Sequence, residues 1–81
     1  MKRIYADFNN FDADGTLPLT CRGSLDSIAR LGGELRDGEE IVLSDGELEA
    51  VARAFRWKDG SWEARAENWV FVDIESGRTV G

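Results

Sequence analysis

The stretch "WKDGSW", residues 57–62, places Asp59-Gly60 between two runs of strand-forming residues. An Asp-Gly pair between such runs is the strongest short-range signal for a β-hairpin. With a two-residue loop, the pairing would join aromatic with aromatic, opposite charges, and apolar with apolar residues, a combination that stabilises neighbouring strands. The predicted pairs are Trp57 with Trp62, Arg56 with Glu63, and Phe55 with Ala64.

The segment that leads into this hairpin permits two structures. Ser44 and Glu47 fit a helical capping box, and alanines favour a helix over residues 47–56. A helix would have to end abruptly before Trp57 for the hairpin to form. We therefore expect a strand over residues 48–57 and keep the helix as the alternative.

Three other segments have the patterns of strands. Residues 2–8 ("KRIYADF") alternate between apolar and polar, which is typical of a half-buried strand. In residues 39–44 ("EEIVLS"), Ile41 and Leu43 face one way and Val42 the other, which also indicates a strand. Residues 68–74 ("NWVFVDI") are apolar on both faces, as in a strand covered on both sides. Pro18 cannot donate a backbone hydrogen bond, so we expect it at a sheet edge or a strand end.

Residues 23–33, "GSLDSIARLGG", indicate a short helix or helical turn at one end of the core. Ser24 is a suitable N-cap and Gly32 a suitable residue for the C′ position. Apolar residues recur at three-residue spacing on the predicted buried face: Leu25, Ile28 and Leu31.

Short strands, Asp-Gly turns and one helical turn together predict an all-β fold. We expect a small antiparallel barrel of five to six strands, resembling the Src-homology-3 domain, with one short helical turn. An oligonucleotide/oligosaccharide-binding-like barrel is the alternative, and an α+β fold replaces both if residues 47–56 are helical. Residues 1–76 should form a single domain, followed by a flexible C-terminal tail over residues 77–81.

Composition excludes several classes of function. The 81 residues carry a net charge of −6, which argues against nucleic acids and anionic membrane surfaces as partners. The absence of histidine removes His-based catalytic triads and nearly all zinc sites. The single cysteine, Cys21, cannot form an internal disulfide, and the first residues show no apolar leader. We therefore expect a cytoplasmic location.

The stretch "FDADGTL", residues 11–17, contains D-x-D-G-T, a signature that resembles the haloacid dehalogenase-type phosphatases. Their chemistry needs a doubly wound parallel sheet, which this chain is too short to build, and a later acidic pair for Mg²⁺. We therefore expect a hairpin turn between the first two strands. Asp12 and Asp14 would bond to the backbone there, and Gly15 would adopt a positive φ.

The same region half matches a calcium loop, since Asn10, Asp12, Asp14 and Gly15 fit its first six positions. Position twelve, where the loop requires a bidentate Glu, is Cys21. Asn10, Asp12 and Asp14 are therefore only a weak candidate cation site, and the sequence predicts no resident metal or cofactor.

Several segments in order resemble a group of small bacterial proteins of unknown function: "ADFNN", Asp14-Gly15, "GSLDSIARLG", "LRDGEEIVLSDGELE" and "WEA". The resemblance covers residues 5–66 and implies a strand over residues 48–57, where members often carry Val in place of Ala. It implies no activity, cofactor, partner or functional residue.

No set of residues supplies both a nucleophile and a base, so we expect no catalytic site. The leading hypothesis is a non-enzymatic module that binds another protein or itself, with no small-molecule ligand. Its candidate interaction residues are Trp57, Trp62 and Trp69. For the Trp57–Trp62 pair we favour a core position over an exposed patch. The alternatives are a nucleic-acid or translation-associated barrel and a weak Ca²⁺-binding module.

Overall fold

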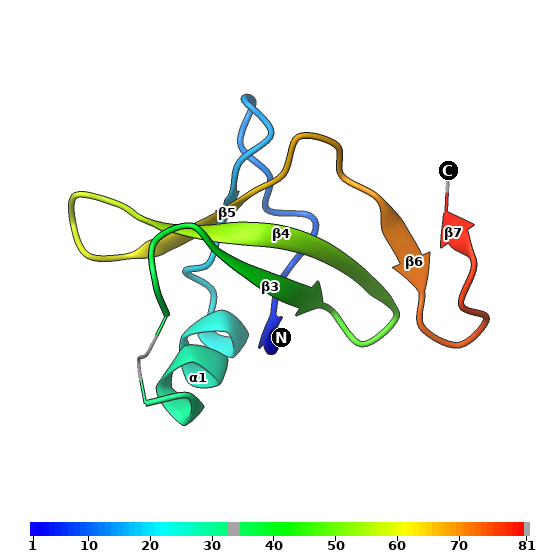
Figure 1. Ribbon diagram of the computed structural model, residues 1–81, viewed down its shortest axis with the longest axis horizontal. Helices are drawn as coiled ribbons and strands as arrows, with labels where there is room; N and C mark the ends of the chain where they lie inside the picture. Colours follow the sequence, from blue (N-terminus) through cyan, green and yellow to red (C-terminus); the bar gives the residue numbers. More distant parts are fainter. Residues whose placement is uncertain (33–34, 81) are drawn as a thin grey trace.

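The computed structural model describes residues 1–32 and 35–80, and within them the chain forms a β-rich fold with one short helix (Figure 1). The elements follow one another as β1 (Lys2–Tyr5), β2 (Leu17–Pro18), α1 (Arg22–Arg30), β3 (Glu39–Ser44), β4 (Leu48–Arg56), β5 (Trp62–Arg65), β6 (Phe71–Asp73) and β7 (Thr79–Val80). A small β-rich fold with a helical turn was predicted, and this much is confirmed.

The long strand β4 organises the sheet. It pairs with β3 along one edge, and with both β5 and β6 along the other. The pairing order is β1-β3-β4-β5-β2, while β7 extends the sheet from β6. In Figure 1, β6 and β7 lie at the opposite end of the sheet from the tip of the β4–β5 hairpin.

The sheet is mixed, which corrects the prediction of purely antiparallel strands. β1 runs parallel to β3, with Lys2 beside Ile41. A parallel pair needs a long crossover connection, and the segment that carries β2 and α1 supplies it. The hairpin turn predicted within residues 11–17 forms, with the Gly15 N–H donating to Asp12 O and the Asp12 N–H donating to Thr16 O. It does not pair the first two strands as predicted, because β1 and β2 lie at the two ends of the pairing order.

Residues 48–56 form a strand, so the predicted strand is confirmed and the helical alternative is wrong. The alanines that favoured a helix are Ala50, Ala52 and Ala54, and all three face the interior as every second residue of β4. Their buried neighbours include Ile41 and Leu43 of β3, the two residues predicted to share one face. Small side chains on β4 therefore accommodate larger ones from β3 and the hairpin.

The hairpin forms at Asp59-Gly60, but its loop is one residue longer than predicted. The Gly60 N–H donates to Trp57 O (2.9 Å), the Trp57 N–H donates to Ser61 O (2.8 Å), and Gly60 has φ +88°. These are the features of a type I turn closed by a glycine bulge. Asp59 Oδ1 stabilises this turn, because it accepts both the N–H and the hydroxyl of Ser61.

The longer loop shifts the register by one residue, so the predicted cross-strand pairs are wrong. A shift of one residue changes which side chains share a face. The observed pairs are Arg56 with Trp62, Phe55 with Glu63, and Ala54 with Ala64.

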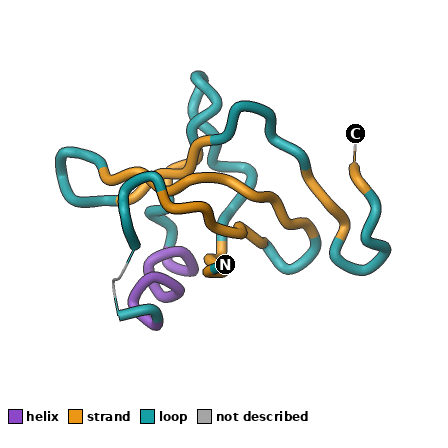
Figure 2. The backbone as a smooth tube through the Cα atoms, in the orientation of Figure 1, coloured by secondary structure: helices purple, strands orange, loops and turns teal. Residues whose placement is uncertain are grey.

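Helix α1 is attached to the end of β1. Ser24, predicted as the N-cap, is instead fully buried inside the helix, and its hydroxyl donates to Tyr5 O (2.6 Å). Ser27 Oγ accepts the Tyr5 N–H (3.0 Å). Cys21 occupies the N-cap position, and Gly32 has φ +70° just past the C-cap, as predicted. Figure 2 shows the helix on one side of the strands.

Of the three apolar residues predicted on the buried face of the helix, Leu25 is exposed, while Ile28 joins the core and Leu31 packs against it. At the other end of the chain, β7 pairs with β6. The domain boundary predicted at residue 77 therefore falls inside a hairpin. The last residue of the predicted tail, Gly81, lies outside the described residues.

Candidate functional site

A groove of about 490 Å³ lies between the loop of residues 12–16, called the Asp loop here, and the tip of the β4–β5 hairpin. The pairing of β2 with β5 creates it, because Pro18 lies opposite Glu63 and so brings the preceding loop beside the hairpin. The groove is lined by Asp12, Asp14, Thr16, Pro18, Trp57, Ser61, Trp62, Glu63 and Arg65.

The Asp loop is held by its own hydrogen bonds. The Gly15 N–H donates to Asp12 O (3.0 Å), and the Asp12 N–H donates to Thr16 O (2.9 Å). Asp14 Oδ1 accepts the Thr16 N–H (3.0 Å), and Gly15 has φ +83° as predicted. Hydrogen bonds from Thr16 hold the pKa of Asp14 below its ordinary value, so this carboxylate is ionised at neutral pH.

Asp12 differs from Asp14 in having no partner for its side chain. It is exposed, and its carboxylate forms no hydrogen bond or ion pair with any residue in the described ranges. The prediction that both Asp side chains bond to the backbone is therefore right for Asp14 and wrong for Asp12. The Asp loop thus carries one carboxylate that stabilises the turn and one that is available to a ligand.

The three tryptophans have three different environments. Trp62 is buried, and the Arg56 guanidinium lies 5.4 Å from its ring centroid. Trp69 is half-buried, and its indole N–H donates to Gly15 O (2.9 Å), which fixes the Asp loop. Trp57 is 52% exposed at the hairpin tip, and no aromatic or cationic group among the described residues covers its ring. The core position favoured for the Trp57–Trp62 pair is therefore right only for Trp62.

An aromatic cluster that was not predicted from the sequence packs next to the Asp loop, through Phe11. Phe11 lies edge-on to Trp69 at 4.9 Å and to Phe71 at 6.3 Å, and Phe8 lies edge-on to Phe71 at 5.0 Å. The signal was present, because two phenylalanines in a segment rich in Asn and Asp need an apolar partner. The cluster joins the loop to β6.

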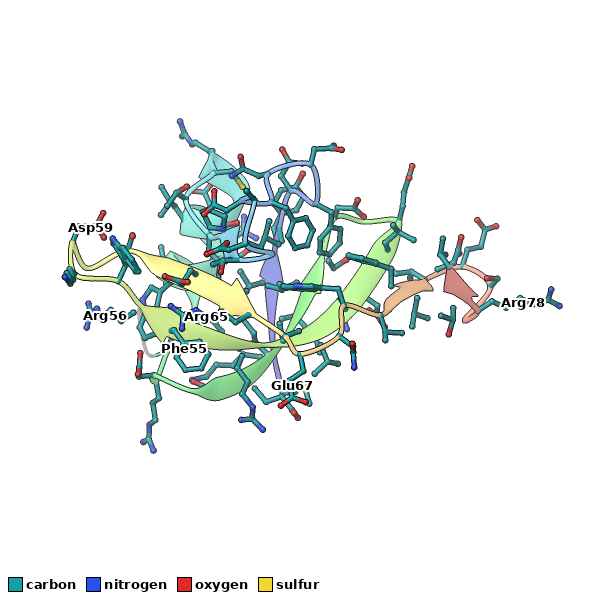
Figure 3. All side chains as sticks on the ribbon, turned by 90° about the horizontal axis from the view of Figure 1, so that it is seen from above. Phe55, Arg56, Asp59, Arg65, Glu67 and Arg78 are labelled. Carbon is teal, nitrogen blue, oxygen red and sulfur yellow. The ribbon has the colours of Figure 1, made fainter. Side chains whose placement is uncertain are left out.

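The groove's one cationic side chain, Arg65, already has partners. Its Nε donates to Glu63 Oε2 at 2.8 Å, and this bond raises the pKa of Arg65. Its guanidinium also lies 4.9 Å from the Phe55 ring centroid, and Figure 3 shows the two side chains beside each other. Glu63 is buried, and it lines the groove together with Arg65, so the pair forms one wall of the groove.

The weak cation site predicted at Asn10, Asp12 and Asp14 does not come together as one unit. Asn10 does not line the groove, and Asp14 is engaged by Thr16. Within residues 1–32 and 35–80, no three His, Cys, Asp or Glu side chains are grouped closely enough to hold a metal ion. The Cys21 thiol lies 3.2 Å from the Ser24 hydroxyl, which is not a base that could activate it.

Comparison with known proteins gives no match, either to a family model, to a curated protein or to a solved structure. In the part of the chain that the structure describes, no helix is long and apolar enough to cross a membrane.

Proposed function

We propose that this protein is a non-enzymatic interaction module that binds a partner protein through the groove. The observation that carries the proposal is the presence of two unpartnered groups in one groove, the exposed ring of Trp57 and the carboxylate of Asp12. Tryptophan is among the residues most enriched at interface hot spots. An exposed tryptophan beside a free carboxylate is a combination that a partner can cover with a gain in free energy.

The charge of the groove favours a protein partner over a nucleic acid. Asp12, Asp14 and Glu63 contribute three carboxylates, and Arg65 is already paired with Glu63. A surface that binds phosphates needs unpaired cations, whereas the carboxylates of this groove repel phosphates. The whole chain, with a net charge of −6, acts in the same direction.

The non-enzymatic part of the proposal is supported by the chemistry of the available side chains. The sequence has no histidine, and Cys21 has a hydroxyl rather than a base beside its sulfur. A general base must lie within hydrogen-bond reach of the group that it activates.

A pull-down from an extract of the cells that make this protein tests the proposal. The full chain and the variant Trp57→Ala are immobilised, together with Glu67→Gln and Val51→Ala, which change exposed residues outside the groove. A partner retained by the full chain and by both controls, and lost by Trp57→Ala, is the expected result. Recovery of no partner, together with a strictly monomeric protein in solution, would contradict the proposal. Equal capture by all variants would also do so.

Three further assignments belong to the same proposal. The classification as a small barrel of the Src-homology-3 type is supported by the way that β4 carries both β5 and β6 on one edge, since shared strands form the corners of compact β folds. A cytoplasmic location is supported by the lone cysteine. Membership of the group of small bacterial proteins is supported by the segments within residues 5–66.

A further inference from the structure

We propose that the groove recognises an arginine side chain of the partner, with its guanidinium against the Trp57 ring and paired with the Asp12 carboxylate. This inference rests on the proposed function and specifies the chemistry of the ligand. The partner segment is therefore a peptide that carries an exposed arginine.

The charges that line the groove call for a cation. Three carboxylates and one guanidinium give a formal charge of −2, because Asp12, Asp14 and Glu63 outnumber Arg65. Arg65 and Glu63 neutralise each other at 2.8 Å. The remaining negative charge belongs to the Asp loop, on the opposite side of the groove from the hairpin tip that carries Trp57.

The hairpin itself shows which cation suits its aromatic residues. It carries three aromatic side chains, and two of them already lie under a guanidinium of the same chain. Arg56 lies 5.4 Å from the Trp62 ring centroid, and Arg65 lies 4.9 Å from the Phe55 ring centroid. Trp57 is the third, and no cation in the described part of the chain lies over it. An arginine from a partner would complete the same pattern.

Arginine fits better than lysine for a geometric reason. A planar guanidinium can stack on an indole ring and at the same time donate two parallel hydrogen bonds to a carboxylate, whereas an ammonium is a compact point charge. The two receiving groups also stand on fixed supports. The Asp loop is fixed by Trp69 and Thr16, and the hairpin tip by Asp59 and Ser61, so little conformational freedom is lost on binding.

The test uses the full chain, labelled with ¹⁵N, and four capped pentapeptides of glycine and serine that differ only in the central residue. The central residues are arginine, citrulline (its uncharged isostere), lysine and glutamate. The indole N–H resonance of Trp57, assigned with Trp57→Phe, reports occupation of the groove. We expect the arginine peptide to shift this resonance more than lysine does, with citrulline and glutamate giving no shift. Added salt should reduce the shift.

Variants locate the contact. Trp57→Ala, followed through amide resonances of the Asp loop, should lower the affinity for the arginine peptide about fivefold, because an exposed cation–π contact is lost. Asp12→Asn should lower this affinity about threefold, because an exposed ion pair is lost. Glu67→Gln removes the same charge outside the groove and should leave the affinity unchanged. The dispersion of the amide spectrum confirms that each variant is folded.

The outcomes separate this inference from the proposed function. Equal binding of citrulline and arginine overturns the role of charge, and equal binding of lysine overturns the preference for a guanidinium. If no peptide shifts Trp57, yet the pull-down still retains a partner in a Trp57-dependent manner, the arginine inference fails and the interaction module stands. A response to an RNA oligonucleotide in place of the peptide overturns both.

Discussion

Gly23 lies in the first turn of α1 directly against the ring of Tyr5. A Cβ built on Gly23 would clash with Tyr5 Cδ1 and would lie 2.9 Å from Tyr5 Cγ, which is closer than such atoms approach in real structures. Gly23→Ala therefore has to displace the Tyr5 side chain. The backbone of Tyr5 is hydrogen-bonded to the side chains of Ser24 and Ser27 in the helix, so β1 cannot simply move away.

The expected loss exceeds the gain in helix propensity. Tyr5 is 43% exposed, so about half of the roughly 200 Å² that a tyrosine can bury is at stake, worth at most about 2.5 kcal/mol. Replacing glycine by alanine in a helix returns at most about 1 kcal/mol, and less in the first turn. We expect Gly23→Ala to destabilise the protein by about 1–2 kcal/mol.

A double-mutant cycle with Tyr5→Ala isolates the contact. The three atoms nearest the new methyl group all belong to the Tyr5 ring, so its removal relieves that clash, and Gly23→Ala should stabilise the Tyr5→Ala protein by about 0.5 kcal/mol. Free energies of unfolding from urea titrations of the four proteins give the coupling. The sign of the Gly23→Ala effect should reverse between the two backgrounds. The same destabilisation in both would refute the reasoning.

Three further predictions concern turns, pH and cations. Gly60→Ala should lower the free energy of unfolding by about 1 kcal/mol in a urea titration, because φ is +88° there although no atom lies within 4 Å of the new Cβ; no loss would exclude the glycine bulge. The folded pKa values of Asp14, Asp59 and Glu39 are lowered mainly by hydrogen bonds, so their stabilisation is present above the unfolded pKa and lost as pH falls through the folded values. The urea midpoint should therefore be flat from about pH 5 to 7 and fall below about pH 4, and a midpoint insensitive to acid would contradict this. Millimolar Ca²⁺ should leave the melting temperature unchanged, and a rise would restore the calcium module.

Sequence patterns of a few neighbouring residues correctly predicted those strands, turns and helix ends that depend mainly on contacts between neighbours in the chain. The hairpin signal at Asp59-Gly60 correctly identified residues 48–56 as a strand, and Gly32 correctly marked the end of the helix. The register failed because Asp-Gly suits both a two-residue turn and a three-residue turn with a bulge. The choice between them depends on the bonds from Asp59 to Ser61, which the dipeptide alone does not specify.

Long-range pairing was beyond the reach of local signals. Nothing in residues 2–5 distinguishes a parallel partner from an antiparallel one, because alternation reports only which face is buried. Ser24 has the sequence signature of an N-cap, but its hydroxyl lies where the backbone of Tyr5 needs a donor. The buried serine satisfies a tertiary requirement rather than a helical one.

The candidate site shows the same division. Asp12, Asp14, Trp57 and Trp62 were each singled out, but as two unrelated features more than forty positions apart in the chain. The groove exists because two residues of β2 pair with β5, and a two-residue strand that contains a proline carries almost no sequence signal.

The parallel pairing of β1 with β3 determines the order in which the strands can pair during synthesis. The first strand leaves the ribosome early, but its hydrogen-bonding partner begins at Glu39 and is synthesised much later. The antiparallel strands β3, β4 and β5 are contiguous in the chain, so they can assemble as soon as they emerge. The N-terminal strand then joins an existing edge, and until it does, that edge of β3 is open to strands of neighbouring chains.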